Sequence, residues 1–311
     1  ELMYAPTPLH IPDGFLSLPV AIVCWVITVV VLAFALRKAG KMSERQVPLM
    51  GIMAAFIFAA QMINFPVAGG TSGHLLGGVL AAVLLGPWPA MLVMTAVIAL
   101  QGLLFQDGGL LVMGANILNM GVLPAAIGYG FYRPTIGRKR GLQLVLVGVA
   151  AWLSVMASAL STSLQVWLSG NARLEIIIPA MLGVHALIGL GEAAITVAAL
   201  AFILRTRPDL AESSGDDRRG GRGWVVAGLL ITLVVVVLSP LASADPDGLE
   251  RVAIDMGFMQ AGQEAPYQIL PDYSLPVLGA TPLSTILSGA IGVVVLVGLF
   301  FLSARLLKKK K

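Results

Sequence analysis

The stretch LQLVLVGVAAWLSVMASALSTSLQVWL, residues 142–168, runs for 27 positions without a charged side chain. A helix of about 20 apolar residues crosses a hydrocarbon core about 30 Å thick, so this stretch is long enough to span a bilayer. Eight more stretches share its character, and ionisable side chains interrupt only one of the nine, at His185 and Glu192. The nine stretches are Leu18–Leu36, Pro48–Phe65, Leu75–Leu85, Ala90–Phe105, Leu110–Tyr132, Leu142–Leu168, Ile176–Leu204, Trp224–Leu241 and Leu283–Ala304.

The composition supports the same class and excludes others. Only 12% of the 311 residues are charged and 58% are hydrophobic, whereas soluble domains carry about 25% charged residues. Only helices and closed barrels satisfy their backbone in lipid, and these stretches lack the alternation of barrel strands. The basic residues form no footprint beside a soluble core, so we expect no nucleic-acid partner. The sequence predicts an all-α polytopic protein of the cell membrane, with lipid as its surroundings.

The basic residues predict an orientation. If all nine stretches cross, segments 37–45, 133–140, 205–222 and 305–311 lie on one side and hold 18 of the 20 Lys and Arg residues. The positive-inside rule makes that side cytoplasmic, which places the N-terminus outside and the C-terminus inside. Leu75–Leu85 is too short to span unaided. It either continues through the following Gly-Pro-Trp-Pro or re-enters, and re-entry would move a basic loop outside.

Composition also divides the chain. Residues 205–223 are polar, rich in glycine and of mixed charge, which is typical of a flexible linker. We therefore predict a seven-helix module over residues 1–204, a cytoplasmic linker over 205–223 and a two-helix module over 224–311. The outer loop 242–282 holds six acidic residues against Arg251 alone. This charge either attracts divalent cations or gates their access, or it reflects only the scarcity of Lys and Arg outside.

Two of the three histidines, His10 and His74, fall on the predicted outer side. Imidazole suits Ni, Cu, Co and Zn, so they are either a transition-metal pair or two unrelated surface residues. His185 and Glu192 lie seven residues apart in one span and serve either an ion or proton path or a buried polar contact. Asn116 and Asn119 either support a site or join helices.

The chain has no Walker motif, G-x-S-x-G or H-E-x-x-H, so we expect it not to be an enzyme.

Several motifs resemble one family in their order along the chain. Leu9–Ser17, LHIPDGFLS, resembles the amino-terminal M-H-I-P-D-G signature of the CbiM/NikM family. These proteins are the substrate-capture subunits of cobalt and nickel energy-coupling-factor (ECF) transporters. Residues 64–78, NFPVAGGTSGHLLGG, and the segment from Gly183 to Ala193 are also similar to that family. Residues 245–250, DPDGLE, resemble the P-D-G-L-E box of the two-span accessory subunit, which can be fused to the capture subunit.

The resemblance implies a metal site. In the family, Ni²⁺ or Co²⁺ is the transported substrate. Its ligands are the N-terminal amine, the next backbone amide nitrogen, the imidazole of that second residue and a second histidine. The matching groups here are the Leu9 amine, His10 and His74. Nitrogen donors favour such ions over Mg²⁺ and Ca²⁺. Because Glu1–Pro8 precede Leu9, its amine is free only if that segment is removed; otherwise another group fills the position.

The resemblance also implies partners. These are a membrane scaffold subunit and two cytoplasmic ATPase subunits, with no organic cofactor. We expect Asn64, Ser72, His185 and Glu192 to support the ligands, without a ligand role of their own. The alternative is a self-sufficient cation channel or proton-coupled carrier that uses Glu192 and His185. A membrane-embedded enzyme has no motif in its favour, and the ligands do not separate nickel from cobalt.

Overall fold

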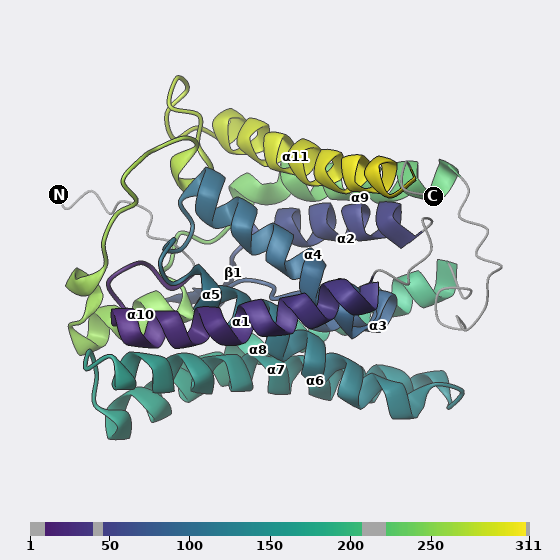
Figure 1. Cartoon of the computed structure of the whole chain (residues 1–311). Helices are drawn as coiled ribbons and strands as arrows, with labels where there is room; N and C mark the ends of the chain where they lie inside the picture. The colour runs from purple at the N-terminus through teal and green to yellow at the C-terminus, as the bar shows by residue number, and fades with distance from the viewer. Residues whose placement is uncertain (1–9, 40–45, 207–221, 309–311) are drawn as a thin grey trace.

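The structure, a computed structural model, describes residues 10–39, 46–206 and 222–308 as a bundle of helices with one short hairpin (Figure 1). The two hairpin strands are β1 (Phe65–Val67) and β2 (Thr71–Gly73). The helices are α1 (Leu18–Ala39), α2 (Gln46–Gln61), α3 (Gly78–Leu85), α4 (Pro87–Leu100), α5 (Met113–Asn116), α6 (Leu123–Tyr132), α7 (Arg140–Leu168), α8 (Leu174–Thr206), α9 (Arg222–Leu238), α10 (Gly248–Met256) and α11 (Pro282–Lys308).

Each of the nine apolar stretches contains a helix, so the prediction of a helical membrane protein is confirmed. Within the described residues, five helices are long and apolar enough to cross a bilayer: Leu18–Ala39, Pro87–Phe105, Arg140–Leu168, Leu174–Thr206 and Pro282–Arg305. The wider turns of a π-helix extend α4 to Phe105 and join α5 to α6. The count of nine crossings and their orientation stay predictions.

The stretch Leu75–Leu85 forms a helix of only eight residues, α3. At 1.5 Å per residue its length is about 12 Å, so it does not cross a bilayer unaided. The chain turns at Gly86, whose φ of +85° favours glycine, and Pro87 begins α4 at a position where its missing N–H costs nothing. All but the last residue of α3 are buried, and the helix lies inside the bundle.

Helix α1 shows how the bundle meets lipid. Its buried face is built from small side chains, Ala21, Cys24, Thr28 and Ala35, which let neighbouring helices approach closely. Its exposed face carries large apolar side chains, which a water-soluble protein would bury in its core. An exposed face of this kind indicates that hydrocarbon, rather than water, surrounds the helix. The exposed apolar residues of α1 include Ile22, Val23, Val26, Ile27, Val30 and Phe34.

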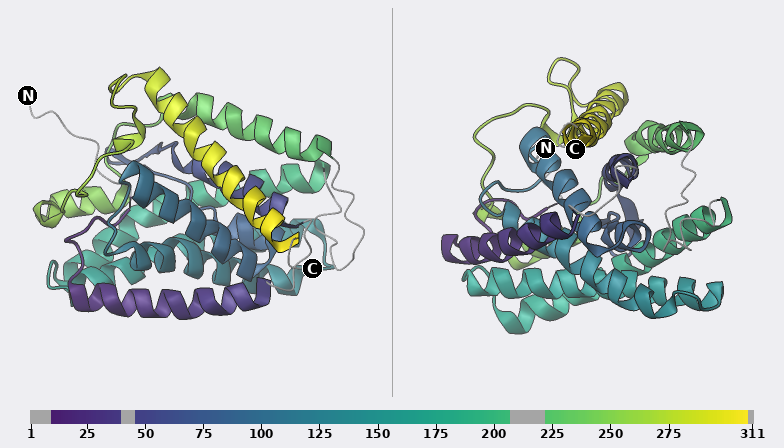
Figure 2. Two further views of the ribbon diagram at one scale, coloured as in Figure 1. Left: turned by 45° about the horizontal axis from the view of Figure 1, so that its top comes forward. Right: turned by 45° about the vertical axis from the view of Figure 1, so that its right-hand side comes forward.

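The C-terminal helices pack on the first part of the chain rather than standing apart from it. Helices α9 and α11 lie beside α2, as Figures 1 and 2 show. A methyl group on Gly228 would lie 2.6 Å from Ile52, and one on Gly292 would lie 2.3 Å from Phe58. Glycine at both positions therefore permits the close contact. Most of the predicted linker, residues 207–221, lies outside the described part of the chain.

Helix α10 is an element that the sequence analysis did not predict. It lies in the outer loop, at the end of the bundle where α1 begins (Figure 1). Asp247 and Glu250 form a capping box, in which each side chain accepts a hydrogen bond from the other residue's backbone N–H. An acidic or hydroxyl residue followed three positions later by Glu is a known helix-start signal, so the box was readable in the sequence.

The N-terminal motif packs against the same outer loop. The Gln263 N–H donates to the Asp13 carbonyl oxygen at 2.7 Å, and the Phe15 and Phe258 rings meet edge to face at 5.1 Å. Gly14 lies between these contacts with a φ of +91°. A methyl group on Gly14 would lie 1.9 Å from the Ala261 carbonyl oxygen. Glycine is therefore required both by the backbone conformation and by the close approach of the loop.

We expect Gly14→Ala to lower the free energy of unfolding by about 2–5 kcal/mol. Left-handed backbone costs about 1–2 kcal/mol for a residue with a Cβ, and overpacking adds about 1–3 kcal/mol. Gly69→Ala is the matched control, because Gly69 has a φ of +80° but no described atom within 4 Å of the added methyl group. Unfolding of the purified proteins in detergent micelles should show a larger loss of unfolding free energy for Gly14→Ala than for Gly69→Ala. Equal losses would mean that the contact with Ala261 is unimportant.

Candidate metal centre

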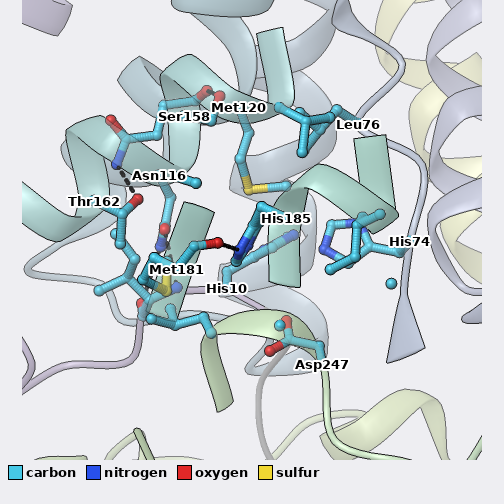
Figure 3. Close-up of a pocket in the computed structure, with 18 residues that line it drawn as sticks. His10, His74, Leu76, Asn116, Met120, Ser158, Thr162, Met181, His185 and Asp247 are labelled. Carbon is cyan, nitrogen blue, oxygen red and sulfur yellow. Dashed lines mark hydrogen bonds between the residues drawn. The ribbon is translucent and has the colours of Figure 1, made fainter. Parts of the chain in front are cut away.

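All three histidines point into one cavity of about 80 Å³ near the outer loop (Figure 3). They come from three distant segments: His10 precedes α1, His74 follows β2, and His185 lies in α8. The ring centroids of His10 and His74 are 5.7 Å apart. The structure therefore brings together the two histidines proposed as ligands. Leu9 lies outside the described residues, so nothing is shown of its amine.

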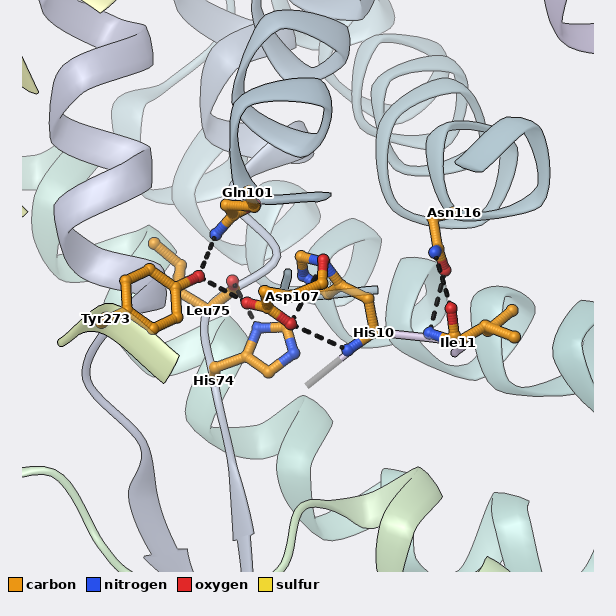
Figure 4. A network of polar contacts seen from close by, with 8 residues as sticks. All are labelled: His10, Ile11, His74, Leu75, Gln101, Asp107, Asn116 and Tyr273. Atoms are coloured by element: carbon orange, nitrogen blue, oxygen red, sulfur yellow. Dashed lines mark hydrogen bonds and ion pairs between the residues drawn. The ribbon is translucent and has the colours of Figure 1, made fainter. Parts of the chain in front are cut away.

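His10 is 2% exposed and is held by Asp107 (Figure 4). Its backbone N–H donates to Asp107 Oδ1 at 3.3 Å, and its ring Nδ1 lies 3.1 Å from the Asp107 carbonyl oxygen. The other ring nitrogen, Nε2, is buried and has no hydrogen-bond partner among the described residues. A buried nitrogen without a partner is costly unless something binds it. The ring is therefore chemically suited to accept a metal ion.

Two polar side chains fix the segment that follows His10. Asn116 accepts a hydrogen bond from the Ile11 N–H at 3.1 Å and donates to the Ile11 carbonyl at 3.0 Å. The Asp13 carboxylate accepts hydrogen bonds from the backbone N–H groups of residues 110–112. Asn116 thus supports the His10 segment, whereas Asn119 joins helices by donating to Thr162 and Gln165 of α7.

Glu192 fixes the segment that follows His74. Its carboxylate is fully buried and accepts hydrogen bonds from the N–H groups of Leu76 at 2.6 Å and Gly77 at 3.1 Å. On the other side, the Gln61 amide donates to the Leu76 carbonyl at 2.9 Å. Glu192 therefore acts on the backbone beside His74, and it does not line the cavity. This arrangement is that of an anchor for the loop.

The remaining predicted supports have different positions. His185 lines the cavity, and its Nδ1 lies 2.8 Å from the Met181 carbonyl of the preceding turn. Asn64 and Ser72 are not among the residues that line the cavity. Instead they hold the outer loop: the Asn64 carbonyl accepts from the Ser243 N–H at 2.8 Å, and the Ser72 hydroxyl donates to the Asp245 carbonyl at 2.7 Å.

The DPDGLE box closes one side of the cavity, which the sequence analysis did not predict. The Ser72 N–H donates to the Pro246 carbonyl at 2.8 Å, so the box pairs with strand β2 just before His74. Asp247, Gly248 and Leu249 line the cavity, and a methyl group on Gly248 would lie 2.8 Å from the His185 ring. Burial raises the pKa of Asp247 to about 8, against its backbone hydrogen bond from Glu250. Burial therefore favours the neutral form of Asp247 relative to an exposed carboxyl group.

A bundle of apolar helices around a cavity lined by histidines defines an integral multi-pass membrane protein. Residues 10–210 match the CbiM family, described as the cobalt uptake substrate-specific transmembrane region, and residues 222–309 match the PDGLE domain. The chain belongs to the CbiM family and carries a C-terminal PDGLE domain.

Relatives agree with this assignment. An Archaeoglobus fulgidus protein named as a fused nickel transport protein, NikMN, is 33% identical over 96% of this chain and 98% of its own length. The cobalt transport protein CbiM of Geobacter sulfurreducens is 31% identical, over 69% of this chain and 65% of its own. A crystal structure of a transition metal transporter superposes with a TM-score of 0.58 at 32% identity, and it covers 68% of this chain and all of that one. These names describe metal transport rather than catalysis.

Proposed function

We propose that this chain is the substrate-specific component of an ATP-driven importer of the ECF type. It captures Ni²⁺ or Co²⁺ at the outer face of the cell membrane through His10 and His74. The observation that carries the proposal is the convergence of these two rings, 5.7 Å apart, with the His10 Nε2 buried and unpartnered among the described residues. Imidazole nitrogen is a ligand that both ions accept, so the choice between them stays open.

The proposed orientation follows from charge. The four basic segments face the cytoplasm under the positive-inside rule, with nine crossings, the N-terminus outside and the C-terminus inside. This arrangement would put the cavity and the outer loop on the side from which the metal arrives. Exposed acidic residues of that loop, such as Asp255 and Glu264, then raise the local concentration of divalent cations.

The amine ligand depends on the mature N-terminus. In the numbered chain the Leu9 nitrogen lies in an amide bond with Pro8 and is not a free amine. Either Glu1–Pro8 are removed, or another group occupies that coordination position. Mass spectrometry of the purified protein, together with its metal content, distinguishes the two.

The energy source provides the functional test. We expect proteoliposomes that contain this chain alone to accumulate no Ni²⁺ or Co²⁺. Uptake should require the scaffold and ATPase subunits, with ATP on the side of the membrane that carries the ATPases. The chain itself shows no nucleotide motif, so it has no other visible energy source. Omission of ATP is the control. Uptake by the chain alone, stopped by Glu192→Gln, would instead establish the carrier alternative. The buried contacts of Glu192 with two backbone N–H groups do not favour that alternative.

A further inference from the structure

Tyr273 belongs to the outer loop of the PDGLE domain, yet its ring lies among the helices of the CbiM part (Figure 4). It stacks on Phe105 with centroids 4.7 Å apart and planes inclined by 16°, and it also meets Phe58 at 6.1 Å. Its backbone is left-handed, with a φ of +54°, and its carbonyl accepts a hydrogen bond from Ser288 of α11. The residue is thus held from both parts of the chain, the ring by the CbiM part and the backbone by α11.

The Tyr273 hydroxyl ends in the network that holds His10. It donates to Asp107 Oδ2 in a short hydrogen bond and accepts from the Gln101 amide at 3.2 Å. The other oxygen of the same carboxylate, Oδ1, accepts the His10 backbone N–H at 3.3 Å. Burial, followed by the charge of Asp107, raises the pKa of Tyr273 well above its usual value. The hydroxyl therefore keeps its proton and remains a donor.

We propose that Tyr273 is a positioning residue for the metal site: its hydroxyl fixes the Asp107 carboxylate, whose Oδ1 accepts the His10 backbone N–H and so holds His10 in place before metal binds. The positioning of His10 by Tyr273 does not depend on the proposed function, whereas its effect on metal affinity does. Through this one hydrogen bond the PDGLE domain acts on a proposed metal ligand. Groups that orient metal ligands matter because a ligand free to turn binds more weakly.

The loop offers a matched comparison residue. The Tyr267 hydroxyl also crosses from the outer loop to the CbiM part, where it donates to the Leu103 carbonyl at 2.9 Å. It makes that contact at an exposed position, with Leu103 rather than with Asp107. Replacement of either tyrosine with phenylalanine removes one hydroxyl and keeps the ring. If the substitution only loosens the loop, both variants should show the effect. An effect transmitted to His10 should appear in Tyr273→Phe alone.

The first test needs no metal. The full chain contains three histidines, so labelling with ¹⁵N-histidine gives three backbone amide signals, and His10→Ala identifies that of His10. We expect Tyr273→Phe to shift the His10 signal and to speed exchange of its amide hydrogen, while Tyr267→Phe leaves both unchanged. A His10 signal that is the same in wild type and Tyr273→Phe would overturn the proposal.

The second test measures Ni²⁺ affinity of the full chain by calorimetry. We expect Tyr273→Phe to weaken binding up to about 10-fold, the lower end of the range for groups that contact a metal ligand directly, because Tyr273 acts through Asp107. In an Asp107→Asn background the same substitution should add almost nothing, because the two residues act in series. Additive effects would show that Tyr273 does not act through Asp107. A wild-type chain that binds no Ni²⁺ would overturn the proposed function, while the amide signal would still decide whether Tyr273 positions His10.

Discussion

We expect His74→Ala to lose high-affinity binding of Ni²⁺ and Co²⁺, with a fall in affinity of at least about 100-fold, and His10→Ala to do the same. A metal site depends on the number of its donors, and loss of a direct ligand should cost more than loss of a group that orients one. The two rings lie in one cavity in an edge arrangement, with centroids 5.7 Å apart. Calorimetry and metal analysis of the purified protein measure the effect.

His185→Ala is the matched control for that experiment. His185 lines the same cavity, but its Nδ1 is engaged by the Met181 carbonyl and the resemblance gives it no ligand role. We expect this variant to lose less affinity than either His10→Ala or His74→Ala, because a supporting group costs less to remove than a ligand. Thermal unfolding of all three variants should stay close to that of the wild type, which separates loss of a ligand from loss of the fold. Stoichiometric metal in either His10→Ala or His74→Ala would refute the assignment of the site.

The second large effect concerns stability. We expect Glu192→Ala to lower the free energy of unfolding by about 2–6 kcal/mol, because two buried backbone N–H groups lose their acceptor and each costs about 1–3 kcal/mol. Without the carboxylate, the N–H groups of Leu76 and Gly77 remain buried without their acceptor. The loop that carries His74 should loosen with them, so metal affinity should fall as well. Unfolding in mixed detergent micelles measures the loss of unfolding free energy.

Thr196→Val is the companion variant for Glu192. The Thr196 hydroxyl lies 3.5 Å from Glu192 Oε1, at the limit of a hydrogen bond, and the substitution leaves the carboxylate in place. We expect a loss below about 1 kcal/mol. A Glu192→Ala protein as stable as the wild type would show that Glu192 is no anchor. Such a result would favour the alternative in which Glu192 serves an ion or proton path.

The helices were predictable because the requirement for about 20 apolar residues is local and is written in consecutive positions. The interruptions were predictable only in part. The Gly-Pro-Trp-Pro after Leu85 indicated that α3 is short, whereas the π-helical turns at Gln101–Phe105 depend on packing within the bundle. Helix α10 was missed although its capping box, Asp247 with Glu250, was present as a sequence signal. The expectation of two modules joined end to end did not anticipate how closely α9 and α11 pack on α2.

The site was predictable only in part. The motifs around His10 and His74 identified the proposed ligands through resemblance. No local pattern showed that His185 enters the same cavity or that Asp107 holds His10. Tyr273 and Asp107 are 166 positions apart in the chain. A contact of that kind arises from tertiary packing, and a single sequence carries no periodicity or spacing that would indicate it.

The pairing of residues 245–247 with strand β2 has a consequence for assembly. Because both partners lie on one polypeptide, their association is intramolecular and its extent does not depend on protein concentration. Short tethers give effective concentrations in the millimolar range. The wall that residues 247–249 add to the cavity therefore stays in place at any level of expression. Two separate polypeptides with the same surfaces would have to meet by diffusion in the membrane, and dilution would part them.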